Sequence, residues 1–177
     1  VLETPAGPMF ETAAILLWLA DRHGALAPSV DSDQRAGFLK RLFFISNTLH
    51  ADLRILFHPE RYIGTNLTQQ HELRRVLRQR LHAHLSNIDA AASQKTSWLC
   101  ADEPSVLDFY LACQLRWMAL YPLGSDRSWM VLAQYPSLYA MCSKLELRAS
   151  VSAARCAEGL GATPFTSPFL AKPPEGT

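Results

Sequence analysis

Leucines recur at helical spacing along two long stretches of the chain, and this pattern constrains the fold more than any other feature. The first stretch follows a potential cap at Asp33 and ends at Pro59. Its steps alternate between three and four residues, at Leu39, Leu42, Ser46, Leu49, Leu53 and Leu56. The second begins near Leu67 and carries one face of Leu73, Leu77, Leu81, Leu85 and Ile88. The spacing predicts two long helices that pack along their apolar faces.

A third helix is predicted from Val106, where the sequence is apolar on all sides and therefore typical of a buried helix. Ser105 and Asp108 stand three residues apart at its start, as in a capping box with Asp in the acidic position. Shorter helices are predicted from Thr12 to a stop at Gly24 and from Pro136 onward. Residues 1–10 suggest a hairpin, so we expect a mainly α protein built as a helix bundle.

Composition and spacing argue against several classes of function. The 17 basic and 16 acidic residues give a net charge of +1, so we expect no nucleic-acid partner. No apolar run approaches the roughly 20 residues of a membrane-spanning helix, so we expect no membrane partner either. The four cysteines are widely spaced, and His82 and His84 lie two apart, unlike a helical metal pair. We therefore expect no metal site and a reducing compartment, the cytoplasm.

Glu11 and Thr12 form the most informative local feature, because a carboxylate and a hydroxyl directly precede an apolar helix. The free N–H groups of a helix start favour a ligand carboxylate, the Thr12 hydroxyl can add a hydrogen bond, and Glu11 can pair with a ligand ammonium group. Together they suit an amino-acid zwitterion. Taken alone, the same pair also suits an ordinary helix cap.

The order of several motifs resembles the glutathione transferase family. Residues 5–19, Pro-Ala-Gly-Pro-Met-Phe-Glu-Thr-Ala-Ala-Ile-Leu-Leu-Trp-Leu, are similar to the segment in which that family holds the γ-glutamyl end of glutathione. Residues 105–112, Ser-Val-Leu-Asp-Phe-Tyr-Leu-Ala, resemble the capping box at its buried central helix, and Tyr135-Pro136-Ser137-Leu138 resembles the start of its next helix. The resemblance extends to about Ala157.

The resemblance implies a domain organisation. Residues 1–27 would be the last strands and helix of a thioredoxin-like, glutathione-binding domain, residues 33–158 an all-helical C-terminal domain, and residues 159–177 an irregular tail. We expect the chain to begin inside a longer protein, so that the Tyr, Ser or Cys that activates the glutathione sulfur lies upstream of Val1. Glu11 and Thr12 would bind glutathione, and no catalytic residue can be named within the chain.

Polar residues beside the leucines of the first predicted long helix are further candidates for a binding site. Asn47, His50 and Arg54 step by three and four and therefore share one side of the helix. The corresponding helix of the family borders both the active-site cleft and the dimer interface. These side chains could thus line the cleft, or they could belong to an interface or a solvated face.

Two functions follow from these expectations. The first is a cytoplasmic, homodimeric detoxification enzyme in which glutathione, as cosubstrate, reacts through its thiolate with a small electrophile. The alternative is a noncatalytic protein-interaction module with the same fold. Glu11 and Thr12 favour the enzyme, since a scaffold has no need of a γ-glutamyl site.

Overall fold

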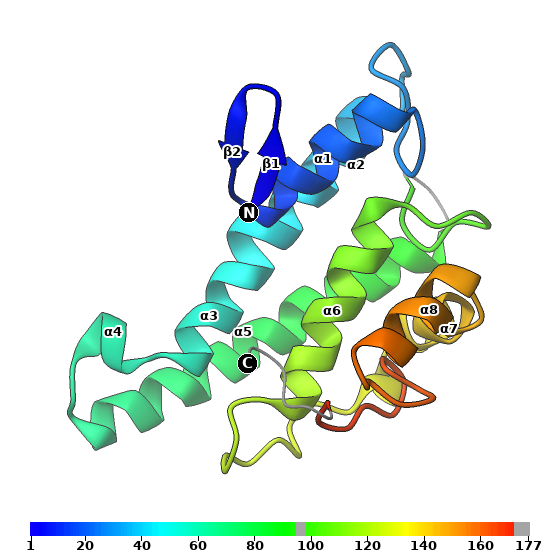
Figure 1. Ribbon diagram of the computed structural model, residues 1–177. Helices are drawn as coiled ribbons and strands as arrows, with labels where there is room; N and C mark the ends of the chain where they lie inside the picture. The colour runs from blue at the N-terminus through cyan, green and yellow to red at the C-terminus, as the bar shows by residue number, and fades with distance from the viewer. Residues whose placement is uncertain (95–97, 172–177) are drawn as a thin grey trace.

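The computed structural model describes residues 1–94 and 98–171. Within these ranges a two-stranded hairpin leads into a set of helices (Figure 1). The elements in chain order are β1 (Leu2–Thr4), β2 (Gly7–Met9), α1 (Thr12–His23), α2 (Arg35–Phe44), the π-helical turn η1 (Ile45–Leu49), α3 (His50–Phe57), α4 (Glu60–Ile63), α5 (Leu67–Ser93), α6 (Val106–Leu120), the 3₁₀ turn η2 (Leu132–Gln134), α7 (Pro136–Glu146) and α8 (Ala149–Ala157). The expected mainly α fold is confirmed.

The hairpin and α1 match the sequence-based prediction closely. Strands β1 and β2 pair antiparallel with Leu2 opposite Met9, and Thr4 donates a 2.7 Å hydrogen bond from its hydroxyl to the Gly7 carbonyl. Helix α1 ends at Gly24, which adopts the left-handed conformation (φ 59°) that favours glycine. The hairpin therefore delivers the chain directly to the start of α1.

The leucine seam runs along α2, η1 and α3, which form one continuous helical rod, but its composition differs from the prediction. Phe38 and Ile45 are buried in the core, while Leu39 and Ser46 are only half-buried. The core-facing stripe of a helix is wider than a two-position seam, so these bulky neighbours occupy it instead. A π-helical turn takes more residues than an α-helical one and also shifts the stripe at its middle.

The prediction that Asp33 caps this rod is wrong. Helix α2 begins at Arg35, after Gln34 in an already helical conformation, and no side chain caps it. Arg35 instead joins the rod to α1 through two 2.7 Å hydrogen bonds with the Asp21 carboxylate. This ion pair fixes α1 against the start of α2.

Helix α6 is buried between the other layers, as its all-round apolar sequence predicts. It contacts α1 and η1 as well as α7, and in Figure 1 it lies between the α1–α2 pair and the α7–α8 pair. Eleven of its fifteen residues are buried, among them Leu107, Leu111 and Leu115. A core of this kind holds both of its neighbours in fixed positions.

Long helix α5 packs along α3 and α7, with Leu77, Leu81 and Leu85 buried as expected. Its N-cap is Asn66, whose side chain accepts the Gln69 N–H at 3.1 Å. Near its other end, Asp89 accepts the Leu138 N–H of the first turn of α7 at 3.0 Å. Helix α5 therefore both supports the core and caps its neighbour.

The segment after α8 is irregular as far as it is described, yet it is anchored. Glu146 accepts the N–H groups of Phe165 and Thr166, both at 2.8 Å, and buried Arg116 donates to the carbonyl groups of Pro164 and Phe169 at 3.0 and 2.9 Å. Phe165 thereby joins the hydrophobic core. In the described ranges, no helix combines the length and the apolar character needed to cross a membrane.

Candidate functional site

The start of α1 is open in a way that suits a ligand. Glu11 precedes the helix with φ 71° and ψ 108°, a conformation that side-chain-bearing residues rarely adopt, and it makes no capping hydrogen bond. The first bond of the helix runs from the Ile15 N–H to the Glu11 carbonyl at 3.0 Å, so the N–H groups of the first turn have no intrahelical acceptor. Glu11 and Thr12 are both exposed. Rare backbone conformations of this kind cluster at active sites and ligand-binding sites, although Leu26, Trp98 and Cys100 also have positive φ here.

The Glu11 carboxylate acts electrostatically on two side chains of the helical bundle. Burial lowers the pKa of the His50 imidazole, the nearby Arg54 charge lowers it further, and Glu11 opposes both. Burial, and then Glu11, raise the pKa of the Tyr110 phenol to about 12. Glu11, which follows the hairpin, is therefore close enough to His50 of α3 and Tyr110 of α6 to act on both. At neutral pH, His50 is neutral and Tyr110 is protonated.

His50 is held in an aromatic setting. Its Nδ1 lies 2.7 Å from the Tyr110 hydroxyl, and its ring centroid lies 5.8 Å from that of Tyr110 and 5.7 Å from that of Trp117. Because Tyr110 keeps its proton, the phenol can donate to Nδ1, which would place the imidazole hydrogen on Nε2. The imidazole is thus fixed in position by helix α6.

A cavity of about 440 Å³ lies beside this histidine. It is lined by His50, Leu53, Arg54, Phe57, His58, Trp117, Tyr121 and Pro122, which come from α3, the turn after it and the end of α6. Two of the three polar candidate residues, His50 and Arg54, thus lie in its wall. Asn47 is exposed one turn earlier, accepts a 2.9 Å hydrogen bond from the Ser46 hydroxyl, and is not part of this lining.

The aromatic wall was not foreseen, although the sequence contained a signal for it. Trp117 and Tyr121 line the cavity, and Tyr110 holds His50 beside it. The three are spaced seven and four apart, so they share one side of a helix predicted to be buried. Aromatic side chains with a polar atom are seldom placed in a closed core without a partner for that atom. Their common side could have marked the edge of a cavity.

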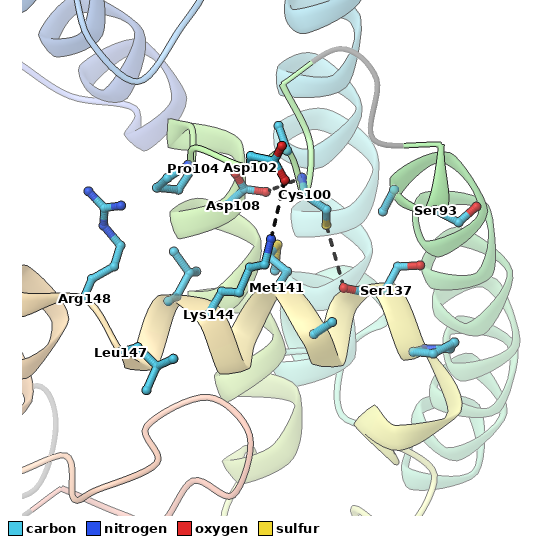
Figure 2. Close-up of a pocket in the computed structure, with 15 residues that line it drawn as sticks. Ser93, Cys100, Asp102, Pro104, Asp108, Ser137, Met141, Lys144, Leu147 and Arg148 are labelled. Carbon is cyan, nitrogen blue, oxygen red and sulfur yellow. Dashed lines mark hydrogen bonds and ion pairs between the residues drawn. The ribbon is translucent and has the colours of Figure 1, made fainter.

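A larger cavity of about 570 Å³ lies between the start of α6 and α7 (Figure 2), and it shares no lining residue with the first. Burial raises the pKa of its Cys100 thiol to about 12, so this sulfur is a poor nucleophile at neutral pH. Figure 2 shows Lys144 directed toward Asp102, at 3.9 Å. Cys100 therefore gives this cavity no reactive thiol.

Ser105 and Asp108 form the capping box of α6, and Asp108 also lines the larger cavity. The Asp108 carboxylate accepts the N–H groups of Ser105 at 2.7 Å and Cys100 at 2.8 Å, while the Ser105 hydroxyl accepts the Leu107 N–H at 3.1 Å. Burial raises the pKa of Asp108 to about 6, although these N–H groups oppose the rise. With both carboxylate oxygens engaged, this residue supports the fold.

His82 and His84 point to different neighbours, as their spacing predicts. His82 Nδ1 lies 2.7 Å from the Tyr135 hydroxyl, and His84 Nε2 lies 3.0 Å from the buried Asp52 carboxylate, which also pairs with Arg80 at 2.9 Å. Across residues 1–94 and 98–171, no group of His, Cys, Asp and Glu side chains is arranged to hold a metal ion.

The chain is similar to glutathione S-transferases in both sequence and structure. Residues 33–140 match the family model described as glutathione S-transferase, C-terminal domain. A sphingomonad glutathione S-transferase, solved in complex with glutathione, is 31% identical over 90% of this chain and 73% of its own, with a TM-score of 0.68. The beta-class enzyme of Sphingomonas chungbukensis is 30% identical over 88% of this chain and 71% of its own (TM-score 0.66). A Methylococcus capsulatus glutathione transferase is 25% identical over 88% and 70% of the two chains (TM-score 0.66). No curated protein matches the chain.

Proposed function

Since the chain belongs to the glutathione S-transferase family, we propose that it binds glutathione and takes part in the reaction of the glutathione thiolate with a small electrophile. The observation that carries this proposal is the open start of α1, where exposed Glu11 and Thr12 meet a helix without a side-chain cap. A relative with 31% identity was solved with glutathione bound, which supports the choice of ligand.

The γ-glutamyl end of glutathione carries an ammonium group and a carboxylate, and the site offers a partner to each. The Glu11 carboxylate would pair with the ammonium group, while the N–H groups of the first turn of α1 and the Thr12 hydroxyl would bind the carboxylate. Charge-assisted hydrogen bonds of this kind contribute roughly 1.5–3 kcal/mol each when shielded from water. These residues bind glutathione and perform no chemistry on it.

We propose that the electrophile binds in the cavity between α3 and α6, because this cavity is lined by His50, whose pKa is affected by the Glu11 charge. The thiolate sulfur would form a bond to the electrophilic carbon there. Either a leaving group then departs with its bonding electron pair, or, in an addition, the neighbouring carbon takes up a proton. His50 and Arg54 would position the electrophile, and proximity would supply much of the rate.

Other features of the enzyme are carried over from the family resemblance. We expect the thiol-activating residue to precede Val1 in the chain, the assembly to be a homodimer, and the role to be detoxification. The cytoplasm is the compartment we propose, because its reducing conditions keep both glutathione and the protein's thiols reduced.

The test is a calorimetric titration of the intact protein with glutathione, comparing wild type with Glu11→Gln. We expect binding in the micromolar to millimolar range and a loss of about tenfold or more in the variant, because one charge-assisted bond contributes roughly 1.5–3 kcal/mol. Glu3→Gln, at an exposed position of β1, is the matched control and should leave the affinity unchanged. Absence of binding in wild type would favour the alternative, a noncatalytic interaction module.

A further inference from the structure

The cavity between α3 and α6 has walls suited to a flat aromatic molecule. Leu53, Phe57, Trp117, Tyr121 and Pro122 supply apolar and aromatic surface on several sides. Its volume of about 440 Å³ lies within the usual range of roughly 300–1,000 Å³ for small-molecule sites. An aromatic ring placed here could stack on side chains of both α3 and α6.

Besides its aromatic and apolar residues, this cavity is lined by three side chains of basic residue types. They are His50, Arg54 and His58, and no Asp or Glu is among the described lining residues. His58 Nδ1 lies 3.6 Å from the Glu60 carboxylate, so a positive charge on the His58 ring would be balanced by Glu60. His50 is neutral at neutral pH because burial lowers its pKa. Arg54 therefore remains as the cation of the wall.

Unlike Arg61 and Arg80, Arg54 has no acidic partner among the described residues. Arg61 lies 4.0 Å from Glu60, and Arg80 lies 2.9 Å from Asp52. In the ranges that the structure covers, the Arg54 guanidinium makes no hydrogen bond or ion pair with another side chain. Its planar group can donate two parallel N–H hydrogen bonds to the oxygens of a carboxylate and can also lie against an aromatic ring.

We infer that the electrophile handled at this site is an aromatic molecule that carries a carboxylate. Its ring packs between Phe57 and Trp117, and its carboxylate binds the Arg54 guanidinium at the rim of the cavity. Arg54 is thus a specificity-determining residue that selects acidic over neutral aromatic substrates. This inference rests on the proposed function, because it assigns a substrate class to the same cleft.

The experiment measures selectivity with two probes that do not react with glutathione, naphthalene-2-carboxylate and its uncharged amide. Each is titrated by calorimetry into the intact protein in saturating glutathione, for wild type, Arg54→Gln, Arg54→Lys and Arg61→Gln. In wild type we expect the carboxylate to bind about tenfold more tightly than the amide, as one charge-assisted hydrogen bond implies. Arg54→Gln should bring that ratio close to one by weakening the carboxylate alone.

The other two variants separate recognition from general electrostatics. Arg54→Lys keeps the positive charge in the last turn of α3 but not the planar fork, so we expect only about a threefold preference. Arg61→Gln removes an exposed charge of α4 that lies outside the cavity lining and should keep the wild-type ratio.

Several results would overturn the inference: a wild-type ratio near one, no binding of either probe, or an equal loss of selectivity in Arg54→Gln and Arg61→Gln. A parallel glutathione titration distinguishes this failure from failure of the proposed function. If glutathione binds and the acid preference is absent, the substrate class is wrong while the proposed function stands.

Discussion

Two helix starts in this protein, those of α6 and α1, solve the same problem in opposite ways. At the start of α6 the N–H groups that lack an intrahelical acceptor are buried. The side chains of Ser105 and Asp108, 0% and 1% exposed, accept hydrogen bonds from the N–H groups of Leu107, Ser105 and Cys100. At α1 no side chain caps the helix, and Glu11 stands exposed with φ 71°.

The difference shows how stability and binding divide between similar motifs. A buried donor without an acceptor is costly, so the start of α6 must be satisfied by the protein itself. An exposed start can leave its donors to water and exchange that water for a ligand. We therefore expect changes at α6 to alter stability and changes at α1 to alter glutathione binding.

Replacement of Asp108 by Ala should give the largest effect. Two enclosed N–H groups lose their acceptor at a cost of roughly 1–3 kcal/mol each, so we expect the free energy of unfolding to fall by about 2–4 kcal/mol. Urea unfolding of the intact protein measures it, with Asp102→Ala, whose side chain is 93% exposed, as the control. A folded variant of normal stability, or one with specifically weakened glutathione affinity, would contradict the structural role.

The same carboxyl group should make stability depend on pH. Its pKa of about 6 in the folded protein exceeds the usual 3.8, so the folded state holds this proton more tightly. The resulting contribution is fully present below about pH 4 and is lost as the pH rises through about 6; its size is on the order of 3 kcal/mol. Unfolding of wild type and Asp108→Asn between pH 4 and 7.5 should show it as a difference in slope; parallel curves would exclude it.

Thr12→Ala tests the other helix start and should have a smaller effect. Loss of one hydrogen bond of about 1 kcal/mol should weaken glutathione binding about fivefold and leave the free energy of unfolding unchanged. Calorimetry and urea unfolding on the same preparation provide both values. A loss of stability without a loss of affinity would make Thr12 an ordinary cap residue.

The smallest expected effect is a gain of stability in Glu11→Gly. Glycine tolerates positive φ better than other residues, so we expect the free energy of unfolding to rise by about 0.5 kcal/mol while glutathione binding falls sharply. Glu11→Gln retains the Cβ atom and should lose affinity without gaining stability. If the glycine variant is less stable than wild type, the backbone at this position is not strained.

Much of the fold could be predicted because it depends on local rules. The stop at Gly24 and the all-apolar run of α6 are two examples, since each determines its element within a few residues. The short helix α4 was missed, because a single turn of helix leaves no periodic pattern in the sequence. Asp33 was wrongly predicted to cap α2, because several neighbouring residues could serve as the cap and the sequence does not select among them.

The sequence by itself determined the helical class of this protein, the order of its elements and the chemical character of Glu11 and Thr12, because periodicity, caps and residue chemistry are local properties. Only the tertiary structure decided that Tyr110 and Trp117 hold His50, that Arg54 lines a cavity while Asn47 does not, and that Glu11 acts on the same cleft. Those relations join segments about 40 to 100 residues apart, and the packing of α6 against its neighbours fixes them.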